Sequence, residues 1–504
     1  MPTSPTSATA APVLVDLAGP FVPLDRFFQR GIGSCHAYLT LREDYREHVR
    51  LAQREIGFGG VRFHGIFSDY VGVVHPGGED PDGGPRLNFQ NVTKIYEFFV
   101  AQGMKPFVEL GFMPARLASG TKTIFDYRAN VTPPRDYAEW SRLVRRFTAH
   151  LVRHFGIEEV LTWHFEVWNE PDLIGAFWTG TQADYFQLYA ESVRAVKSVD
   201  ARLRVGGPAT SKTMWVPDLL AYCKDHGLPL DFISTHHYCV DADLVQGVPD
   251  GPMHYRGVGA MRRDIERVRA QIAASAFPNA ELHFTEWNTC PAHEDVYGKD
   301  SLFTAAFALQ TLKEISGLVD SYMWWTVSDI FEETGLSPLP FTGKYGLVNI
   351  HGVKKSVFHA YRWLAGMHDT EFPLDHPSAR ATISSSGDVR VLAWNLPEVV
   401  ETDLGGGDWL VRGATRHDTF ALRGLRPGRY RVRILRCDTK KGDALGAWRA
   451  AGSPAYPDAA QLAALHAAAE PALIRDETLD LAGDLTLVLD LTPCAFACVD
   501  LERV

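Results

Sequence analysis

The sequence lacks the features of a secreted, membrane-embedded or nucleic-acid-binding protein. Seven cysteines in 504 residues are an odd number that cannot all pair within one chain, so reduced thiols are expected. The segment from Met1 to Pro12 contains neither a basic stretch nor an apolar stretch, and no segment reaches the roughly 18 apolar residues of a membrane-spanning helix. The net charge of -11 is spread along the chain, which argues against a nucleic-acid partner. We therefore expect a cytoplasmic protein with a frayed N-terminal tail and no membrane partner.

Motifs that bind metals or phosphate are also missing. The chain has no CxxC, no HExxH pair and no glycine-rich phosphate loop. His236 and His237 are adjacent, and neighbouring side chains of a strand point to opposite faces, so they would not share one ion. Cys494 and Cys498 would lie about 13 Å apart along a strand, beyond disulfide reach. The sequence predicts neither a metal nor a cofactor.

The part of the chain from about Gly31 to Trp363 alternates short apolar runs with longer segments of 3.6-residue periodicity. This alternation is typical of repeated βα units. Eight such units predict an α/β fold, a (β/α)8 TIM barrel spanning residues 26–365. The eight expected strands are Gly33–Tyr38, Val61–His64, Pro106–Leu110, Thr162–Trp168, Leu203–Val205, Phe232–His236, Glu281–Thr285 and Ser321–Trp325.

After about Gly366 the pattern changes to short strands separated by Gly, Pro and Asp turns. This pattern predicts an accessory all-β sandwich domain over residues 366–504. The N-terminal residues 1–25 would join it through a strand at Val13–Leu17, and an alanine-rich surface helix at Ala459–Ala469 would interrupt it. The expected strands are Ala381–Ser385, Val389–Trp394, Leu410–Val411, Gly428–Leu435, Leu485–Asp490 and Ala495–Leu501.

Two segments carry the strongest chemical signal. Phe165–Pro171 and Leu282–Asn288 each end an apolar run with a glutamate among Trp and Asn residues, Glu170 in the first and Glu286 in the second. Cleavage of a glycosidic bond needs one carboxylic acid to protonate the leaving oxygen and one carboxylate to attack or stabilise the sugar carbon. Either glutamate alone could be an ordinary polar residue at a strand end, but the pair predicts a glycosidase. Asn169 lies beside the first glutamate, where its amide could bind a sugar 2-OH.

Other polar and aromatic side chains follow the predicted strands, at the end where (β/α)8 barrels carry their active sites. A lone His64 or Tyr238 would more often be structural, but this mixture of side chains suits a sugar pocket. Trp325 is the preferred platform for stacking on a sugar, whereas Trp163, Trp168 and Trp287 are expected in the core. The candidate binding residues are Arg62, His64, Asn169, His236, Tyr238, Trp325, Glu332 and Glu333.

Four segments resemble those of glycoside hydrolase family 39, a family of barrels whose acid/base and nucleophile follow the fourth and seventh strands. They are Phe58–Phe67, Trp168–Leu173, Phe284–Asn288 and Trp325–Glu333. The resemblance covers almost the whole chain. It implies that Glu170 is the acid/base and Glu286 the nucleophile, that the eight candidate binding residues surround the sugar, and that no cofactor is required.

The substrate class follows from the adjacent pair Glu332 and Glu333. Two carboxylates suit the hydroxyls of neutral xylose, whereas an iduronate would meet charge repulsion there. The leading interpretation is a retaining exo-β-1,4-xylosidase that releases xylose from the non-reducing ends of xylooligosaccharides. Another family 39 activity, such as α-L-arabinosidase, α-L-iduronidase or endo-glycosidase, remains an alternative, as does a non-catalytic carbohydrate-binding protein. The sequence does not distinguish a monomer from a homo-oligomer.

Overall fold

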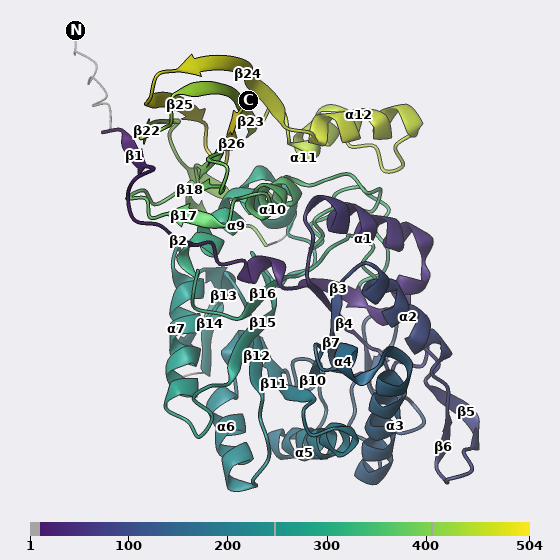
Figure 1. The fold of residues 1–504 in the computed structure, drawn as a ribbon. Helices are drawn as coiled ribbons and strands as arrows, with labels where there is room; N and C mark the ends of the chain where they lie inside the picture. The colour runs from purple at the N-terminus through teal and green to yellow at the C-terminus, as the bar shows by residue number, and fades with distance from the viewer. Residues whose placement is uncertain (1–10, 246–247, 405–406) are drawn as a thin grey trace.

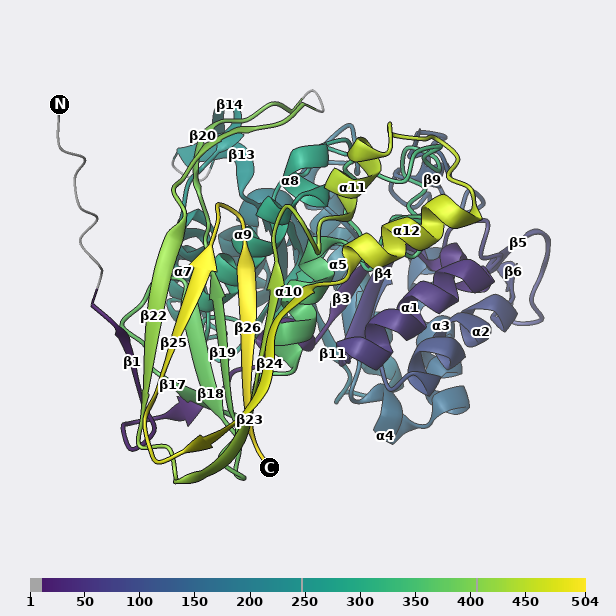
Figure 2. The same ribbon diagram turned by 90° about the horizontal axis from the view of Figure 1, so that it is seen from above.

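The computed structural model describes residues 11–245, 248–404 and 407–504, so most of the expected N-terminal tail lies outside the described part of the chain. Figure 1 shows a helix-wrapped barrel with a set of mostly antiparallel strands above it, and in Figure 2 the two parts lie side by side. The chain is therefore built from an α/β part and a β part that pack against each other.

Eight parallel strands close into a barrel, as the alternating pattern predicts. Each of the eight expected strands is found, and most of their ends lie within a few residues of the expected positions. Around the barrel they are β3 (Ile32–His36), β4 (Gly60–His64), β7 (Lys105–Leu110), β10 (His164–Val167), β11 (Arg204–Thr210), β12 (Phe232–Tyr238), β15 (Glu281–Asn288) and β16 (Ser321–Trp324), which pairs with β3.

Amphipathic helices cover the outside of the barrel. In α3 (Tyr137–Phe155), Trp140, Val144 and Leu151 recur at helical spacing and are fully buried against it. The other long helices are α1 (Glu43–Glu55), α2 (Gln90–Ala101), α5 (Gln182–Val199), α6 (Val216–Asp225), α7 (Ala260–Ala273), α9 (Leu302–Glu314) and α10 (Ser356–Ala365). Shorter pieces are α4 (Ile157–Val160), α8 (Val296–Asp300) and the 3-10 turns η1 (Phe27–Gln29), η2 (Ala37–Leu41) and η3 (Ser211–Thr213).

Three hairpins lie in connections that follow barrel strands, so they add surface at the carboxyl end of the barrel. The first, β5 (Val74–Glu79) with β6 (Pro85–Leu87), follows β4. The second, β8 (Thr123–Ile124) with β9 (Ala129–Asn130), follows β7. The third, β13 (Val240–Val245) with β14 (Val248–Tyr255), follows β12.

Two sheets enclose a second hydrophobic core that includes Val15, Phe420, Val391 and Val499. The smaller sheet has the order β1 (Val13–Asp16), β22 (Arg416–Arg423), β25 (Leu485–Leu491). The larger has the order β2 (Val22–Pro23), β17 (Thr370–Phe372), β18 (Ala379–Ile383), β19 (Val389–Trp394), β26 (Phe496–Arg503), β23 (Gly428–Cys437), β24 (Ala472–Leu481). The N-terminal segment thus supplies one strand to each sheet of the sandwich.

One strand expected in the sandwich lies in a separate hairpin instead. Leu410–Val411 lies in β21 (Leu410–Arg412), which pairs only with β20 (Glu398–Glu401) in a hairpin outside both sheets. The reason is Trp409, whose ring lies 5.2 Å from that of Phe303 on the barrel helix α9, so the hairpin reaches over the barrel. Strands β2, β17, β20, β22 and β24 were not foreseen.

The sandwich and the barrel are joined by buried polar and aromatic contacts. Trp394 on β19 donates a hydrogen bond from Nε1 to Oε1 of Gln310 on α9, at 2.9 Å. Two helices extend the sandwich over the barrel, α11 (Ala444–Ala450) and α12 (Ala459–Ala469), and the bounds of α12 are those expected. His359 on α10 bonds the carbonyl oxygen of Ala469 at 2.8 Å. The end of α12 therefore packs directly on a barrel helix.

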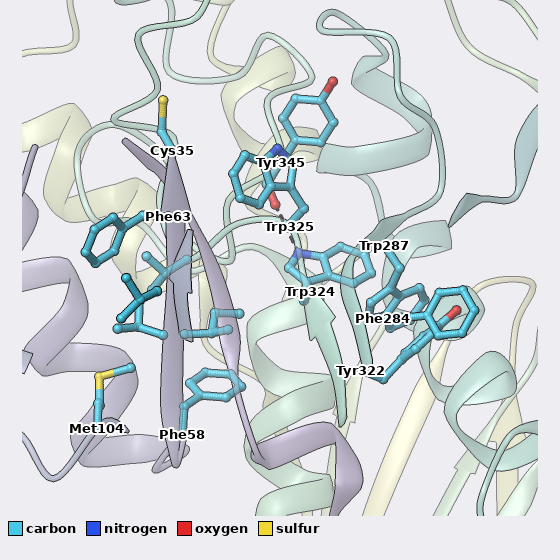
Figure 3. Close-up of a cluster of buried hydrophobic side chains, with 14 of the residues drawn as sticks. Cys35, Phe58, Phe63, Met104, Phe284, Trp287, Tyr322, Trp324, Trp325 and Tyr345 are labelled. Carbon is cyan, nitrogen blue, oxygen red and sulfur yellow. Dashed lines mark hydrogen bonds between the residues drawn. The ribbon is translucent and has the colours of Figure 1, made fainter. Parts of the chain in front are cut away.

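Trp163, Trp168 and Trp287 are fully buried, as expected for core residues. Figure 3 shows Trp287 beside Trp324, near Phe284 and Tyr322, and the dashed line marks the 3.0 Å hydrogen bond from Trp324 Nε1 to the carbonyl of Tyr345. All seven cysteines are buried and free. Within the described ranges, none of the helices has both the length and the apolar character needed to cross a bilayer.

Candidate active site

The carboxyl ends of the barrel strands bring nine of the ten predicted site residues into one connected cluster. Glu286, Arg62, His64, His236 and Tyr238 lie on barrel strands β15, β4 and β12. Asn169, Glu170, Trp325 and Glu333 lie on the loops that follow β10 and β16. Glu332 lies outside this cluster.

Glu286 is buried and held by two donors. Arg62 Nη1 donates to Oε1 at 2.5 Å, and the Tyr238 hydroxyl donates to Oε2 at 2.9 Å. His64 Nε2 lies 3.5 Å from Oε1. The carboxylate is thus fixed in orientation, with a cation and a hydroxyl to stabilise its charge.

Glu170 stands on an unusual stretch of backbone. Its φ angle is +43° and that of Trp168 is +69°, in the left-handed region that residues other than glycine rarely adopt. The loop is anchored further along at Asp172, whose carboxylate accepts bonds from the backbone and hydroxyl of Ser211. His236 Nδ1 lies 2.9 Å from Oε1 of Glu170, so the imidazole and the carboxyl share a hydrogen bond. The surroundings therefore hold this side chain over the barrel mouth.

The two glutamates face each other across the mouth. A carboxylate oxygen of Glu170 and one of Glu286 lie within 4.8 Å of each other, and His236 Nδ1 lies 2.9 Å from Glu170 and 3.7 Å from Glu286. Such a short gap suits direct attack by one carboxylate on a sugar carbon, because the inverting arrangement needs carboxyl groups about 6.5–9.5 Å apart to admit a water.

Arg62 links the mouth to a buried charge network inside the barrel. Its guanidinium donates to Glu166 at 2.8 Å and to the amide oxygen of Asn169 at 2.8 Å, and lies 3.0 Å from Glu109. Glu109 and Glu166 were not predicted as site residues. A charged residue within a predicted apolar strand is a signal that could have identified them. Their role is to position the cation that binds Glu286 and Asn169.

Burial raises the pKa of both facing glutamates. For Glu170 the pKa rises to about 8, and the positive charge of Arg62 opposes the rise. For Glu286 it rises to about 7, opposed by His236 and by Arg62. The first proton taken up by the pair is therefore held preferentially by Glu170, which is the division that an acid and a nucleophile require.

His64 is neutral, because burial lowers its pKa to about 3. Its Nδ1 lies 2.6 Å from Glu109, and its ring centre lies 4.7 Å from that of Trp325. Trp325 is itself only 2% exposed. These rings form one wall of the cluster.

The adjacent residues Glu332 and Glu333 point to different places. Glu333 Oε2 lies 2.9 Å from His293, while its Oε1 lies 3.6 Å from His64 and has no hydrogen-bond partner among the described residues. Glu332 binds His36 and Arg42, at 2.8 and 3.0 Å. Of the two, only Glu333 therefore has an unpartnered acceptor beside His64, whose Nε2 also lies 3.5 Å from Glu286.

A cavity of about 330 Å³ lies beside Glu332, the neighbour of the cluster residue Glu333. Aromatic and acidic side chains line it, including Tyr38, Tyr70, Tyr127, Asp126 and Glu332. Tyr127 stacks on His36 with ring centres 4.1 Å apart, and neither residue was foreseen. Tyrosine faces with carboxylate rims are suited to sugar rings and their hydroxyls.

Glu170, His236 and Glu286 are close enough together to ligate a metal ion. Arg62 already occupies one oxygen of Glu286, and its positive charge would repel a second cation. The arrangement thus suits two carboxylates that exchange protons with a substrate rather than a metal centre.

The chain is similar to known proteins over nearly its whole length. Residues 11–486 match the profile of glycosyl hydrolases family 39. A β-xylosidase of Caldicellulosiruptor saccharolyticus is 37% identical over 449 residues, 89% of this chain and 89% of that protein. A β-xylosidase of Geobacillus stearothermophilus is 33% identical over 485 residues, 94% and 92% of the two chains. The crystal structure of a monomeric β-xylosidase from Caulobacter crescentus CB15 superposes with a TM-score of 0.90 at 34% identity, over 98% of this chain and 99% of that one.

Proposed function

This chain belongs to glycosyl hydrolases family 39, and we propose that it is a retaining exo-β-1,4-xylosidase that releases xylose from the non-reducing ends of xylooligosaccharides. The observation that carries the proposal is the close pair of buried carboxyl groups, Glu170 and Glu286, at the carboxyl end of the barrel. The β-xylosidases that resemble the chain over most of its length support the choice of sugar.

In the first step Glu286 attacks the anomeric carbon of xylose, and the bond from that carbon to the leaving oxygen breaks. Glu170 gives its proton to that oxygen, so the shortened oligosaccharide leaves as a neutral alcohol. Arg62 and Tyr238, which bind the carboxylate of Glu286, hold it in line for attack. The product of this step is a covalent xylosyl ester of Glu286.

In the second step Glu170 acts as a base. It takes a proton from a water that enters the vacated position, and the oxygen of that water attacks the anomeric carbon. The ester bond breaks, Glu286 leaves as a carboxylate, and xylose is released with its original β configuration. Glu170 ends the cycle protonated, ready for the next substrate.

Neighbouring groups bind the sugar. The guanidinium of Arg62 can only donate, and it donates to the amide oxygen of Asn169. The amide NH2 group of Asn169 would then donate to the sugar 2-OH. The unpartnered Oε1 of Glu333 would accept a bond from another hydroxyl. A negative charge at this place disfavours uronides, including the substrates of α-L-iduronidase.

We also propose that the barrel, residues 26–365, performs catalysis, and that residues 366–504 with the strand from 1–25 form an accessory part. The free, buried cysteines support an enzyme that works in a reducing compartment such as the cytoplasm, where it would finish the degradation of xylan fragments.

A panel of nitrophenyl glycosides tests the function. We expect β-xyloside to be cleaved fastest, α-L-arabinoside slowly and uronides not measurably, with β-xylose as the first product by proton NMR. A 2-fluoro xyloside should attach to Glu286, detected by mass spectrometry of the peptides. First release of α-xylose would overturn retention, and sugar binding without turnover would indicate a carbohydrate-binding protein.

A further inference from the structure

The opposite end of the barrel carries a second cluster of histidine and glutamate. A cavity of about 310 Å³ opens there, lined by the first residues of the barrel strands, such as Gly60, Lys105, His164, Glu281 and Ser321. It therefore lies at the amino ends of the strands, away from the catalytic pair. Enzymes with this barrel carry their catalytic residues at the carboxyl ends of the strands, so this cluster has no part in the proposed hydrolysis.

Three side chains converge on one point in this cavity. His164 Nε2 lies 3.1 Å from Glu281 Oε2, and His283 Nε2 lies 3.2 Å from the same oxygen. The three ligating atoms all lie within 4.8 Å of one another. Glu281 and His283 are two residues apart on β15, so their side chains point to the same face, into the barrel, and meet His164 from β10.

We propose that His164, Glu281 and His283 bind a divalent transition metal ion such as Zn²⁺ at the amino end of the barrel. Zinc binds imidazole nitrogen at about 2.0–2.1 Å and carboxylate oxygen at about 2.0–2.2 Å, so tetrahedral ligands stand roughly 3.3–3.4 Å apart. The two spacings to Glu281 are close to that edge length. The cavity supplies room for water as the remaining ligand.

The surroundings orient the ligands. His283 Nδ1 lies 2.8 Å from the hydroxyl of Ser321, and with that nitrogen donating, Nε2 presents its lone pair to the ion. His164 is stacked on Phe107, with ring centres 4.7 Å apart and planes 10° apart. Both imidazoles are thereby fixed before an ion arrives, which lowers the entropy lost on binding.

The local charges are mixed. Arg204 is the nearest opposing cation, 3.4 Å from both oxygens of Glu281. It is farther away than Arg62 is from Glu286, at 2.5 Å, and its side chain is 31% exposed, so water screens its charge where that of buried Arg62 is not screened. Lys105 is paired with Glu159, and Arg30 donates to the carbonyl of Asp320, so these two cations already have acceptors. Two imidazoles with a single carboxylate favour zinc and its neighbours over magnesium or calcium, which prefer oxygen ligands.

The test uses the full-length protein, freed of metal with a chelator and titrated with ZnCl2 by calorimetry. We expect wild type to bind one ion per chain, and H164Q, E281Q and H283Q each to weaken binding by at least about tenfold. Cobalt in place of zinc should give the visible absorption of a low-coordinate site, which the same variants lose. Undiminished xyloside turnover would show that these three variants are folded.

Two matched controls exclude other sites. E286Q disrupts the histidine and glutamate cluster at the catalytic end and should bind zinc as wild type does. H154Q removes a surface histidine that is paired with Glu97 and should also bind normally. The proposal is overturned if wild type binds no zinc, or if binding survives in E281Q and H283Q but is lost in E286Q.

Discussion

The two ends of the barrel use the same residue types for opposite electrostatic purposes. At the carboxyl end, two buried carboxyl groups face each other, and burial raises the pKa of Glu170 to about 8 and that of Glu286 to about 7. At the amino end, hydrogen bonds that His164 and His283 donate in the metal-free protein hold the pKa of Glu281 well below its usual range. The first arrangement makes protons easy to exchange near neutral pH, whereas the second keeps one carboxylate permanently charged. Placement, more than composition, decides which end can catalyse.

The largest expected difference between the two ends of the barrel is in kcat. E286Q removes the attacking oxygen, and we expect kcat on nitrophenyl xyloside to fall on the order of 10⁵-fold. E281Q makes the same change at the other end and should alter kcat by less than about twofold, because it contacts no reacting atom. Steady-state kinetics of the two purified variants makes the measurement. A comparable loss in both would mean that the two ends are coupled, contrary to this comparison.

A second, smaller effect separates the roles of the two facing carboxyls. E170A removes the proton donor, which contributes about 10²–10⁴-fold to cleavage of a poor leaving group. We expect xylobiose turnover to fall by that factor, while an activated aryl xyloside, which leaves without a proton, is attacked nearly as fast as before. Pre-steady-state kinetics should then show accumulation of the xylosyl enzyme. Equal losses on both substrates would assign the acid to another residue.

The pair Glu333 and Glu332 gives a matched test within the carboxyl end. E333Q removes a charged acceptor aimed at the sugar, and loss of such a bond costs about 1.5–3 kcal/mol, or roughly 10–100-fold in kcat/KM. E332Q alters a rim residue held by His36 and Arg42, and should change kcat/KM for a nitrophenyl xyloside less than about threefold. E333Q should also relax the discrimination against uronides. Identical effects of the two substitutions would remove Glu333 from the sugar site.

The smallest expected effect is in the pH profile. Glu286 works ionised, so kcat/KM should rise as pH increases through its pKa, and Glu170 works protonated, so it should fall as pH increases through the higher pKa. The values belong to the interacting pair, and the charge of ionised Glu286 is what adds to the pKa of Glu170. In E170Q, assayed on an activated aryl xyloside, we expect the alkaline limb to vanish and the acid limb to stay near its wild-type pH, because Glu170 is already neutral while Glu286 titrates. An alkaline limb that persists in E170Q would assign that limb to another group.

The sequence predicts most of the barrel because its signals are local. Each of the eight strands is a short apolar run beside an amphipathic helix, and the two glutamates stand in motifs that can be read without knowing the fold. The sandwich was harder. Strand β24 is an edge strand with mostly exposed residues, so it shows no clean alternation, and β21 is placed by Trp409, whose contact with the barrel lies about a hundred residues away in sequence.

The interior of the site depended on contacts that the sequence does not contain. Glu109 and Glu166 meet Arg62 only because β4, β7 and β10 are brought together in the closed sheet. Glu332 and Glu333 are neighbours in a loop without periodicity, so nothing in their spacing indicates which side chain turns inward. Such choices are made by tertiary packing, which a reading of local patterns cannot supply.

The pairing of β1 with β22 has a consequence for the time course of synthesis. Val13 pairs with Phe420, so the first strand of the chain must wait for a partner made some four hundred residues later. At roughly 5–20 residues per second, the ribosome takes roughly 20–80 seconds to reach it. The barrel can be completed during that wait, while an apolar strand remains without its sheet at the chain's leading end. The sandwich is therefore the last part of the molecule to form, and the nascent chain is most exposed to mispairing at the end that was made first.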